Sequence, residues 1–136
     1  MSDPEVSVEI ALFTKAREYT ALPLVFENDG EKVLRGKYVE VKHFRNGSVP
    51  YALEGDGDAQ NLGMLQMLVC VPLGSGQVEA RQRAADIVKL FWTPANLSLS
   101  YGGLRVRVQK RPVLGTGVKR DTSYVVPVSI FYEVFI

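Results

Sequence analysis

The sequence has few of the residues on which most enzyme and metal sites depend. Its 136 residues include one cysteine and one histidine. One cysteine cannot form an internal disulfide, and this pair cannot complete a four-ligand zinc site. No Ser/His/Asp arrangement has support either. We therefore expect neither a catalytic centre nor a metal, and no bound cofactor.

The sequence also lacks a strong excess of one charge and any long hydrophobic run. The formal net charge is +1 and hydrophobic residues make up 46% of the chain, as in a globular, soluble protein. No segment approaches the roughly 20 apolar residues of a membrane-spanning helix, and the first ten residues lack a signal-peptide pattern. We expect a single domain over residues 1–136, since domains of about 100–150 residues are common.

The single cysteine and the single histidine both lie in strand-like segments. Cys70 belongs to the apolar run MLQMLVCV, which predicts a small buried hydrophobic residue, because a reactive thiolate needs an accessible, electropositive setting. His43 alternates with Val39 and Val41 and has no obvious acidic partner nearby. We interpret it as a surface or packed histidine and not as a general base.

The first half of the chain predicts one helix and three strands. Ser2, Pro4 and Glu5 form a helix-capping pattern, and apolar residues at helical spacing extend the helix to about Glu18. LPLVFEN predicts a short strand, and GKYVEVKHF alternates like a half-buried strand. Residues 45–60 are rich in Gly, Asp and Asn and predict a long loop. The apolar LGMLQMLVCV then predicts a central strand covered on both faces.

The second half predicts a second helix followed by three strands. The helix presents one apolar stripe, formed by Ala80, Ala84, Ile87, Val88 and Phe91. After Thr93-Pro94 come LSLSY, LRVRVQK and SYVVPVSIFYEVFI. The order α-β-β-β-α-β-β-β predicts an α+β fold whose mainly antiparallel or mixed sheet has about six strands.

The glycine-rich turn before the second helix resembles a phosphate cradle in outline. A P-loop needs Lys and Ser/Thr after its last glycine, whereas Gln77 and Val78 follow Gly76 here. The third glycine of a dinucleotide fingerprint is also missing. We interpret Gly74 and Gly76 as allowing a sharp turn, with Ser75 capping the helix. A nucleotide-dependent enzyme is the weakest of three functional hypotheses.

Charge is segregated along the chain. Glu54, Asp56 and Asp58 lie in the expected loop without the spacing of an EF-hand, which predicts a solvated acidic loop or a contact with a partner. No acidic residue occurs between Arg105 and Arg120. That stretch contains the basic residues Arg105, Arg107, Lys110, Arg111, Lys119 and Arg120. Separate patches on a nearly neutral chain favour head-to-tail self-association.

Nucleic-acid binding is the alternative for the same basic stretch. Arg105, Arg107, Lys110 and Arg111 could contact phosphates. No aromatic residues alternate with them to stack bases, which makes this hypothesis weaker than self-association.

The last strand is apolar on both faces. One face is the predicted core face and consists of Tyr124, Val126, Val128, Ile130, Tyr132, Val134 and Ile136. The other carries Val125, Phe131 and Phe135, so a helix or another subunit must cover it. Pro127 lacks an amide hydrogen and predicts an edge position or a bulge. Because a bare apolar edge strand aggregates, we expect oligomerisation.

Two segments resemble a known family. VCVPLGSGQVEARQRAADIVKLF and GGLRVRVQKRPVLGTGVKRDTSYVVPVSIFYEVF are similar to the tail-terminator-like proteins of tailed bacteriophages and prophages, a domain-of-unknown-function family related to the lambda tail terminator. Upstream, the similarity rests on Phe26, Glu27, Asn28, Gly36 and Tyr38. The long acidic loop departs from the family pattern.

This resemblance implies a non-enzymatic assembly protein. Family members form a hexameric ring that caps the tail tube, stops its polymerisation and presents a surface to the head connector. The implied partners are other copies of the chain, the tube protein and the connector, with DNA only passing through the ring. The implied location is the bacterial cytoplasm during assembly and the tail of the virion. The expected interface residues are Glu54, Asp56, Asp58, Arg105, Arg107, Lys110, Arg111, Phe131 and Phe135.

Overall fold

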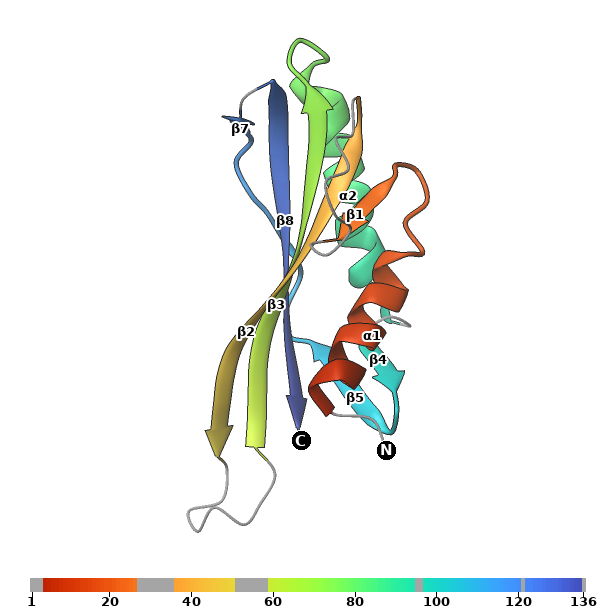
Figure 1. Cartoon of the computed structure of the whole chain (residues 1–136), viewed down its shortest axis with the longest axis vertical. Helices are drawn as coiled ribbons and strands as arrows, with labels where there is room; N and C mark the ends of the chain where they lie inside the picture. Colours follow the sequence, from red (N-terminus) through yellow and green to blue (C-terminus); the bar gives the residue numbers. More distant parts are fainter. Residues whose placement is uncertain (1–3, 27–35, 51–58, 95–96, 121, 136) are drawn as a thin grey trace.

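Two helices and eight strands are present in the described part of the chain, which in this computed structural model comprises residues 4–26, 36–50, 59–94, 97–120 and 122–135 (Figure 1). The helices are α1 (Pro4–Ala16) and α2 (Gln77–Phe91). The strands are β1 (Leu24–Phe26), β2 (Tyr38–Pro50), β3 (Ala59–Pro72), β4 (Ser98–Tyr101), β5 (Leu104–Val108), β6 (Val113–Leu114), β7 (Val118–Arg120) and β8 (Ser123–Phe135).

The strands form one mixed sheet, so the α+β prediction is confirmed. Its order is β1-β2-β3-β8-β5-β4, with β1 parallel to β2 and the other neighbours antiparallel. On the side away from β3, β8 pairs in turn with β5, β6 and β7. The two very short strands, β6 and β7, lack a visible alternation, and the sequence pattern missed them.

Both helices lie on the same side of the strongly twisted sheet (Figure 1). α2 packs on β3 and β8, and α1 packs on β4 and β5. Between helices and sheet lies the core, whose largest fully buried side chains include Tyr132, Phe91, Leu12, Leu65 and Ile87. Burying a large apolar side chain stabilises a fold by about 1.5–3 kcal/mol relative to leaving it exposed. The sheet thus has an inner face under the helices and an outer face without them.

The apolar stripe of α2 is confirmed in full, since all five of its predicted members are buried. The prediction for the turn before it is half right. Gly74 and Gly76 have φ values of +89° and +91°, which side chains other than glycine rarely adopt. The helix cap is Gly76, however, and no side chain caps the helix, so the assignment of Ser75 as the cap was wrong.

β2 and β3 extend into both ends of the expected 45–60 loop. β2 continues to Pro50 and β3 begins at Ala59. Between Arg45 and Ser48 the register with β3 shifts at a bulge, which interrupts the alternation that marks a strand in sequence. The adjoining ends of β2 and β3 extend past the start of α1 and the end of β8 and form an arm (Figure 1). Residues 51–58, with Glu54, Asp56 and Asp58, lie outside the described residues.

The first helix ends at Ala16, two residues before the expected end, and Ser2 lies outside the described residues. β3 is interior, as predicted, but its cover is unequal. Leu65, Met67 and Val69 on the inner face are fully buried, whereas Met64 and Leu68 on the outer face are only half-buried.

β8 is an interior strand, so the prediction of an edge position from Pro127 was wrong. The missing amide hydrogen of Pro127 nevertheless faces a side of β8 where strand pairing is incomplete. The carbonyl of Pro127 accepts a hydrogen bond from the Gly115 amide at 2.8 Å, on the β6 side. Because N and O of one residue point to the same side of a strand, the missing amide hydrogen also faces that side. Pairing there is interrupted between Leu114 and Val118.

The two faces of β8 differ in burial along most of the strand, although Val125 on the outer face is also buried. Val126, Val128 and Ile130 on the inner face are fully buried. On the outer face Phe131 is half-buried and Phe135 is exposed. None of the helices in the described ranges is long and apolar enough to span a membrane.

Candidate assembly surface

An open groove of about 560 Å³ lies on the outer face, where the β4–β5 hairpin meets the end of β8. Three of the predicted interface residues, Arg105, Arg107 and Phe135, line it. The other residues of its lining are Ser98, Gly103, Leu104 and Glu133. The structure therefore brings together predicted residues from strands that are about 30 positions apart in sequence.

The local sequence explains why the two arginines share the groove. β5 alternates, with Val106 and Val108 buried in the core and Arg105 and Arg107 exposed on the opposite face. Gly102 and Gly103 have φ values of +59° and +81° and form the two-residue turn that returns the chain from β4 to β5. This turn brings the start of β4 alongside Arg107.

The groove is less basic than the sequence of β5 suggests, because the fold places a carboxylate of β8 beside Arg107. Glu133 lies directly opposite Arg107 in the β5–β8 register, and the Arg107 Nη1–Glu133 Oε1 distance is 3.5 Å. Gln109 Nε2 donates to the other carboxylate oxygen at 3.4 Å. Because the Arg107 side chain is 69% exposed, this ion pair stabilises the fold by at most about 1 kcal/mol. Arg105 has no ion pair with any residue in the described ranges.

The remaining basic residues separate into different surroundings. Lys110 Nζ lies 4.5 Å from the centroid of the Phe131 ring, a cation–π contact of about 0.5–1 kcal/mol at such a site. Arg120 pairs with Glu40 at the other end of β8, with Nη2 and Oε1 2.7 Å apart. Arg111 is exposed and is not part of the groove. The acid-free stretch 105–120 is therefore not one continuous basic patch, because β2 and β8 supply two carboxylates.

Beside Arg120 lies a buried thiol. Cys70 is fully buried, as the apolar run predicted, and its Sγ donates to the Leu68 carbonyl at 3.5 Å. Burial, followed by the nearby Glu40 carboxylate, raises the pKa of the Cys70 thiol to about 11, while Arg120 partly opposes the shift. A thiol with this pKa stays protonated at neutral pH and is a poor nucleophile.

The sequence missed one polar cluster on the inner face. His43 is packed, as predicted, but it does have an acidic neighbour, because its Nδ1 lies 3.5 Å from Glu9 Oε1 on α1. Its Nε2 lies 2.5 Å from the hydroxyl of Tyr132, within hydrogen-bonding distance. Gly63 leaves the space for the Tyr132 ring, since a Cβ there would overlap it. A contact between a helix and two distant strands has no signature in the local sequence.

The groove offers a surface on which a partner could bind. No group of three or more potential metal ligands occurs among the residues that the structure describes. The Gly74–Gly76 turn contributes no residue to the groove, whose nearest lining residue in sequence, Ser98, comes 22 positions after Gly76. Two arginines beside exposed Phe135 and half-buried Leu104 suit a protein segment that carries carboxylates and apolar groups.

Comparisons with known proteins agree with this interpretation. A family model described as phage tail terminator protein matches residues 7–132. One solved structure shares 32% sequence identity with this chain at a TM-score of 0.67, and the alignment covers 96% of this chain and 92% of the other. A comparison with curated protein sequences finds no match.

Proposed function

Because the chain belongs to the phage tail terminator protein family, a family of structural proteins and not of enzymes, we propose that it ends the growth of a tail tube. Several copies form a ring, hexameric as the family resemblance implies, that sits on the last layer of tube subunits. One ring face matches the tube, and the other rejects a further tube subunit and accepts the head connector. DNA passes through the ring without being recognised by sequence.

The observation that carries this proposal is the family match over residues 7–132. The groove supports it by offering a surface for a neighbouring copy. Arg105 and Arg107 point outward from β5, and the β2–β3 arm ends in a segment with three carboxylates and no basic residue, residues 51–58. In a head-to-tail ring, this segment of one copy binds the groove of the next. Such a heterologous contact forms a closed ring when its rotation closes.

Nucleic-acid binding through the same stretch is less well supported. Glu133 lines the groove and pairs with Arg107, and Glu40 pairs with Arg120, so two of the six basic residues between positions 105 and 120 already have a carboxylate partner. A phosphate backbone would be repelled by both carboxylates.

The test is the growth of tail tubes in the presence of this protein. Tube protein from the same phage is polymerised alone and with increasing amounts of the chain, and tube lengths are measured by negative-stain electron microscopy. We expect elongation to stop and a ring to be visible at one tube end. Tubes that keep growing, with bare ends, at a molar excess of the chain would contradict the proposal.

A further inference from the structure

We infer that the contact between copies has a second anchor, in which the buried ammonium of Lys15 binds a carboxylate from residues 51–58 of the next copy. In the free protein Glu18 of the same copy occupies this place, so assembly exchanges one carboxylate for another. The inference rests on the proposed ring and names a further residue through which its copies recognise each other.

Lys15 is the only charged residue that is buried among those whose exposure the structure describes. It lies on the core-facing side of α1, one turn after Ala11 and Leu12, which are also buried. Lysine side chains usually extend until the ammonium reaches water, whereas the Lys15 side chain is only 7% exposed. Because a buried charge destabilises a fold unless polar groups replace the lost water, this ammonium needs hydrogen-bond acceptors.

Lys15 has one such acceptor within the described ranges. Its Nζ donates to Glu18 Oε1 at 3.1 Å, from the turn that follows α1. An ammonium has three hydrogens to donate, so two remain for other acceptors. The Glu18 side chain is 55% exposed, and an ion pair with so exposed a carboxylate is weak. A carboxylate from a partner can therefore replace Glu18 beside Lys15.

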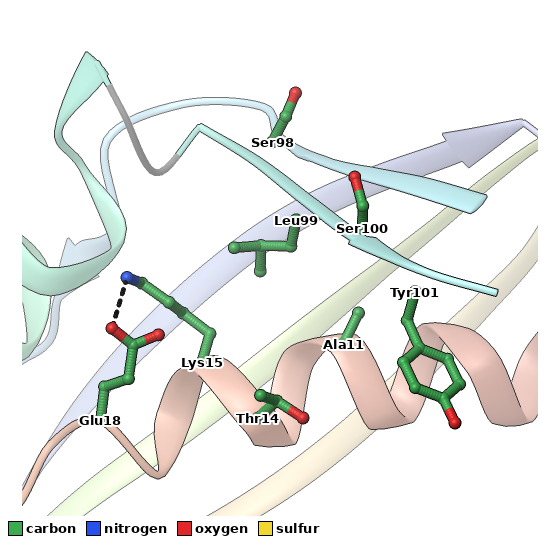
Figure 2. A pocket seen from close by; sticks show the side chains of 8 residues that line it. All are labelled: Ala11, Thr14, Lys15, Glu18, Ser98, Leu99, Ser100 and Tyr101. Carbon is green, nitrogen blue, oxygen red and sulfur yellow. Dashed lines mark hydrogen bonds and ion pairs between the residues drawn. The ribbon is translucent and has the colours of Figure 1, made fainter. Parts of the chain in front are cut away.

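A hollow of about 250 Å³ gives a partner access to this ion pair, between α1 and β4 (Figure 2). Lys15 and Glu18 line it with Ala11, Thr14 and all four residues of β4. Apart from the ion pair, every polar side chain of the lining is a hydroxyl, which can donate to a carboxylate. The hollow is smaller than the about 300–1,000 Å³ of most small-molecule sites, and it suits a single side chain of a neighbouring protein.

A carboxylate fits the hollow better than a phosphate of nucleic acid does. Glu18 already places a carboxylate oxygen at hydrogen-bonding distance from Lys15 Nζ. The lining contains only this one cation, and it is buried, whereas a phosphate backbone is bound through several cations at the surface. The occupant is therefore the side chain of an aspartate or a glutamate.

The next copy of the chain can supply this side chain. Residues 51–58 contain three carboxylates and no basic residue. They lie between β2 and β3, and β4 is the last strand at the opposite side of the sheet, so a head-to-tail neighbour brings the two together. Ser98 lines both the hollow and the groove, so one segment can contact Lys15 as well as Arg105.

Two substitutions that break the same ion pair test the exchange, because they should act in opposite directions. Lys15→Met removes the ammonium and keeps the length of the side chain, so it should raise the concentration for half-assembly at least about fivefold. Glu18→Gln removes the internal competitor and should lower that concentration at least about twofold. Sedimentation over a concentration series, with tube protein absent and present, measures both.

Lys37→Met and Glu79→Gln are the matched controls. Lys37 Nζ and Glu79 Oε1 form an ion pair of 2.7 Å outside the hollow, so neither substitution should change assembly. Chemical denaturation reports the stability of each variant separately. Glu18→Gln alters an exposed side chain, so it tests the exchange even where Lys15→Met does not fold.

A zero-length carbodiimide cross-link identifies the occupant in the wild-type protein. Rings are assembled from equal amounts of unlabelled and ¹⁵N-labelled copies, cross-linked, digested and analysed by mass spectrometry. We expect peptides of mixed labelling that join Lys15 to one of the acidic residues Glu54, Asp56 and Asp58. Below the concentration for assembly, only the link between Lys15 and Glu18 should form.

Each other outcome decides against the inference. Assembly that is unchanged in Lys15→Met and Glu18→Gln, or shifted in the same direction by both, means that the ion pair is only structural. Tube growth that the wild-type protein still stops then leaves the terminator function standing. A cross-link from Lys15 to tube protein assigns the hollow to the tube. Wild-type copies that never associate also refute the inference, and tubes that grow past an excess of them refute the proposed function.

Discussion

At the scale of single residues, Cys70 shows how burial decides chemistry. Its thiol lies against Glu40 and Arg120, and the arginine alone would favour a thiolate. Burial and the carboxylate outweigh it, so the pKa is raised to about 11. The apolar run around Cys70 predicted this outcome, because the neighbours along a buried strand determine how much water reaches the residue.

We expect Cys70 to be nearly inert to thiol reagents in the folded protein. With a pKa of about 11, roughly 0.1% of the thiol is ionised at pH 8, compared with roughly 10% for a thiol of pKa 9. Labelling with Ellman's reagent at pH 8 should be at least about 100-fold slower in buffer than in guanidinium chloride. The rate in buffer should rise as the pH approaches 11, because the thiolate is the reacting species. Fast labelling at pH 8 would show that the site is accessible.

At the scale of elements, α1 is attached to the sheet through a polar contact as well as through packing. Glu9 meets His43 on β2, and His43 meets Tyr132 on β8. Phe13 of the same helix packs against Phe26 of β1 with the rings tilted by 53° and their centroids 4.8 Å apart. These contacts link α1 to β1, β2 and β8. Removing the Tyr132 hydroxyl should therefore weaken the attachment of α1 to the strands.

We predict that Tyr132→Phe destabilises the protein by about 1–2 kcal/mol, since the buried His43 nitrogen loses its hydroxyl partner while the ring still fills the core. Tyr124→Phe is the control, because it removes the same atom from the same strand at a half-buried site where the hydroxyl only meets Gln77 at 3.5 Å. Chemical denaturation measures the loss. In Tyr132→Phe, amide hydrogen exchange should become faster in α1 and stay unchanged in α2. Equal losses of stability in Tyr132→Phe and Tyr124→Phe would mean that the contact between Tyr132 and His43 does not hold the helix.

Elements were predictable where their side chains repeat regularly. The stripe of α2 and the core face of β8 followed from periods of 3.6 and 2, whereas β3 was predicted from its continuous apolar run. The end of β2 was not predictable, because the bulge after Arg45 breaks the period and Asn46 and Gly47 are typical of loops. The edge position predicted from Pro127 was wrong for a related reason. The local sequence does not show that β8 pairs on that side with two short strands, β6 and β7, separated by a gap.

At the scale of the whole molecule, three of the nine predicted interface residues line one groove, and the sequence did not predict the charge of that groove. Arg105, Arg107 and Phe135 do share a groove, as their exposure on β5 and β8 suggested. Glu133 was absent from the predicted set because pairing between β5 and β8 places it beside Arg107 across 26 residues of sequence. A count of charges along the chain cannot include a carboxylate that only the sheet register brings near.

The proposed contact between the groove of one copy and residues 51–58 of the next can be tested by reversing the charge first in the groove and then in the acidic segment. Arg105→Glu places a negative charge in the groove that is proposed to receive Glu54, Asp56 and Asp58, so it should weaken assembly at least about tenfold, equivalent to about 1.4 kcal/mol. Lys119→Glu is the control, since it makes the same charge change at an exposed position on β7, outside the groove.

The reciprocal change decides whether the acidic segment is the partner of Arg105. Changing Glu54, Asp56 and Asp58 to lysine should weaken assembly alone and restore it in combination with Arg105→Glu, because opposite charges then face each other again. Sedimentation at about 50 and 300 mM salt should show the wild-type contact weakening with salt, since the charges lie at an exposed surface. If the combined variant assembles no better than either parent, residues 51–58 do not bind this groove.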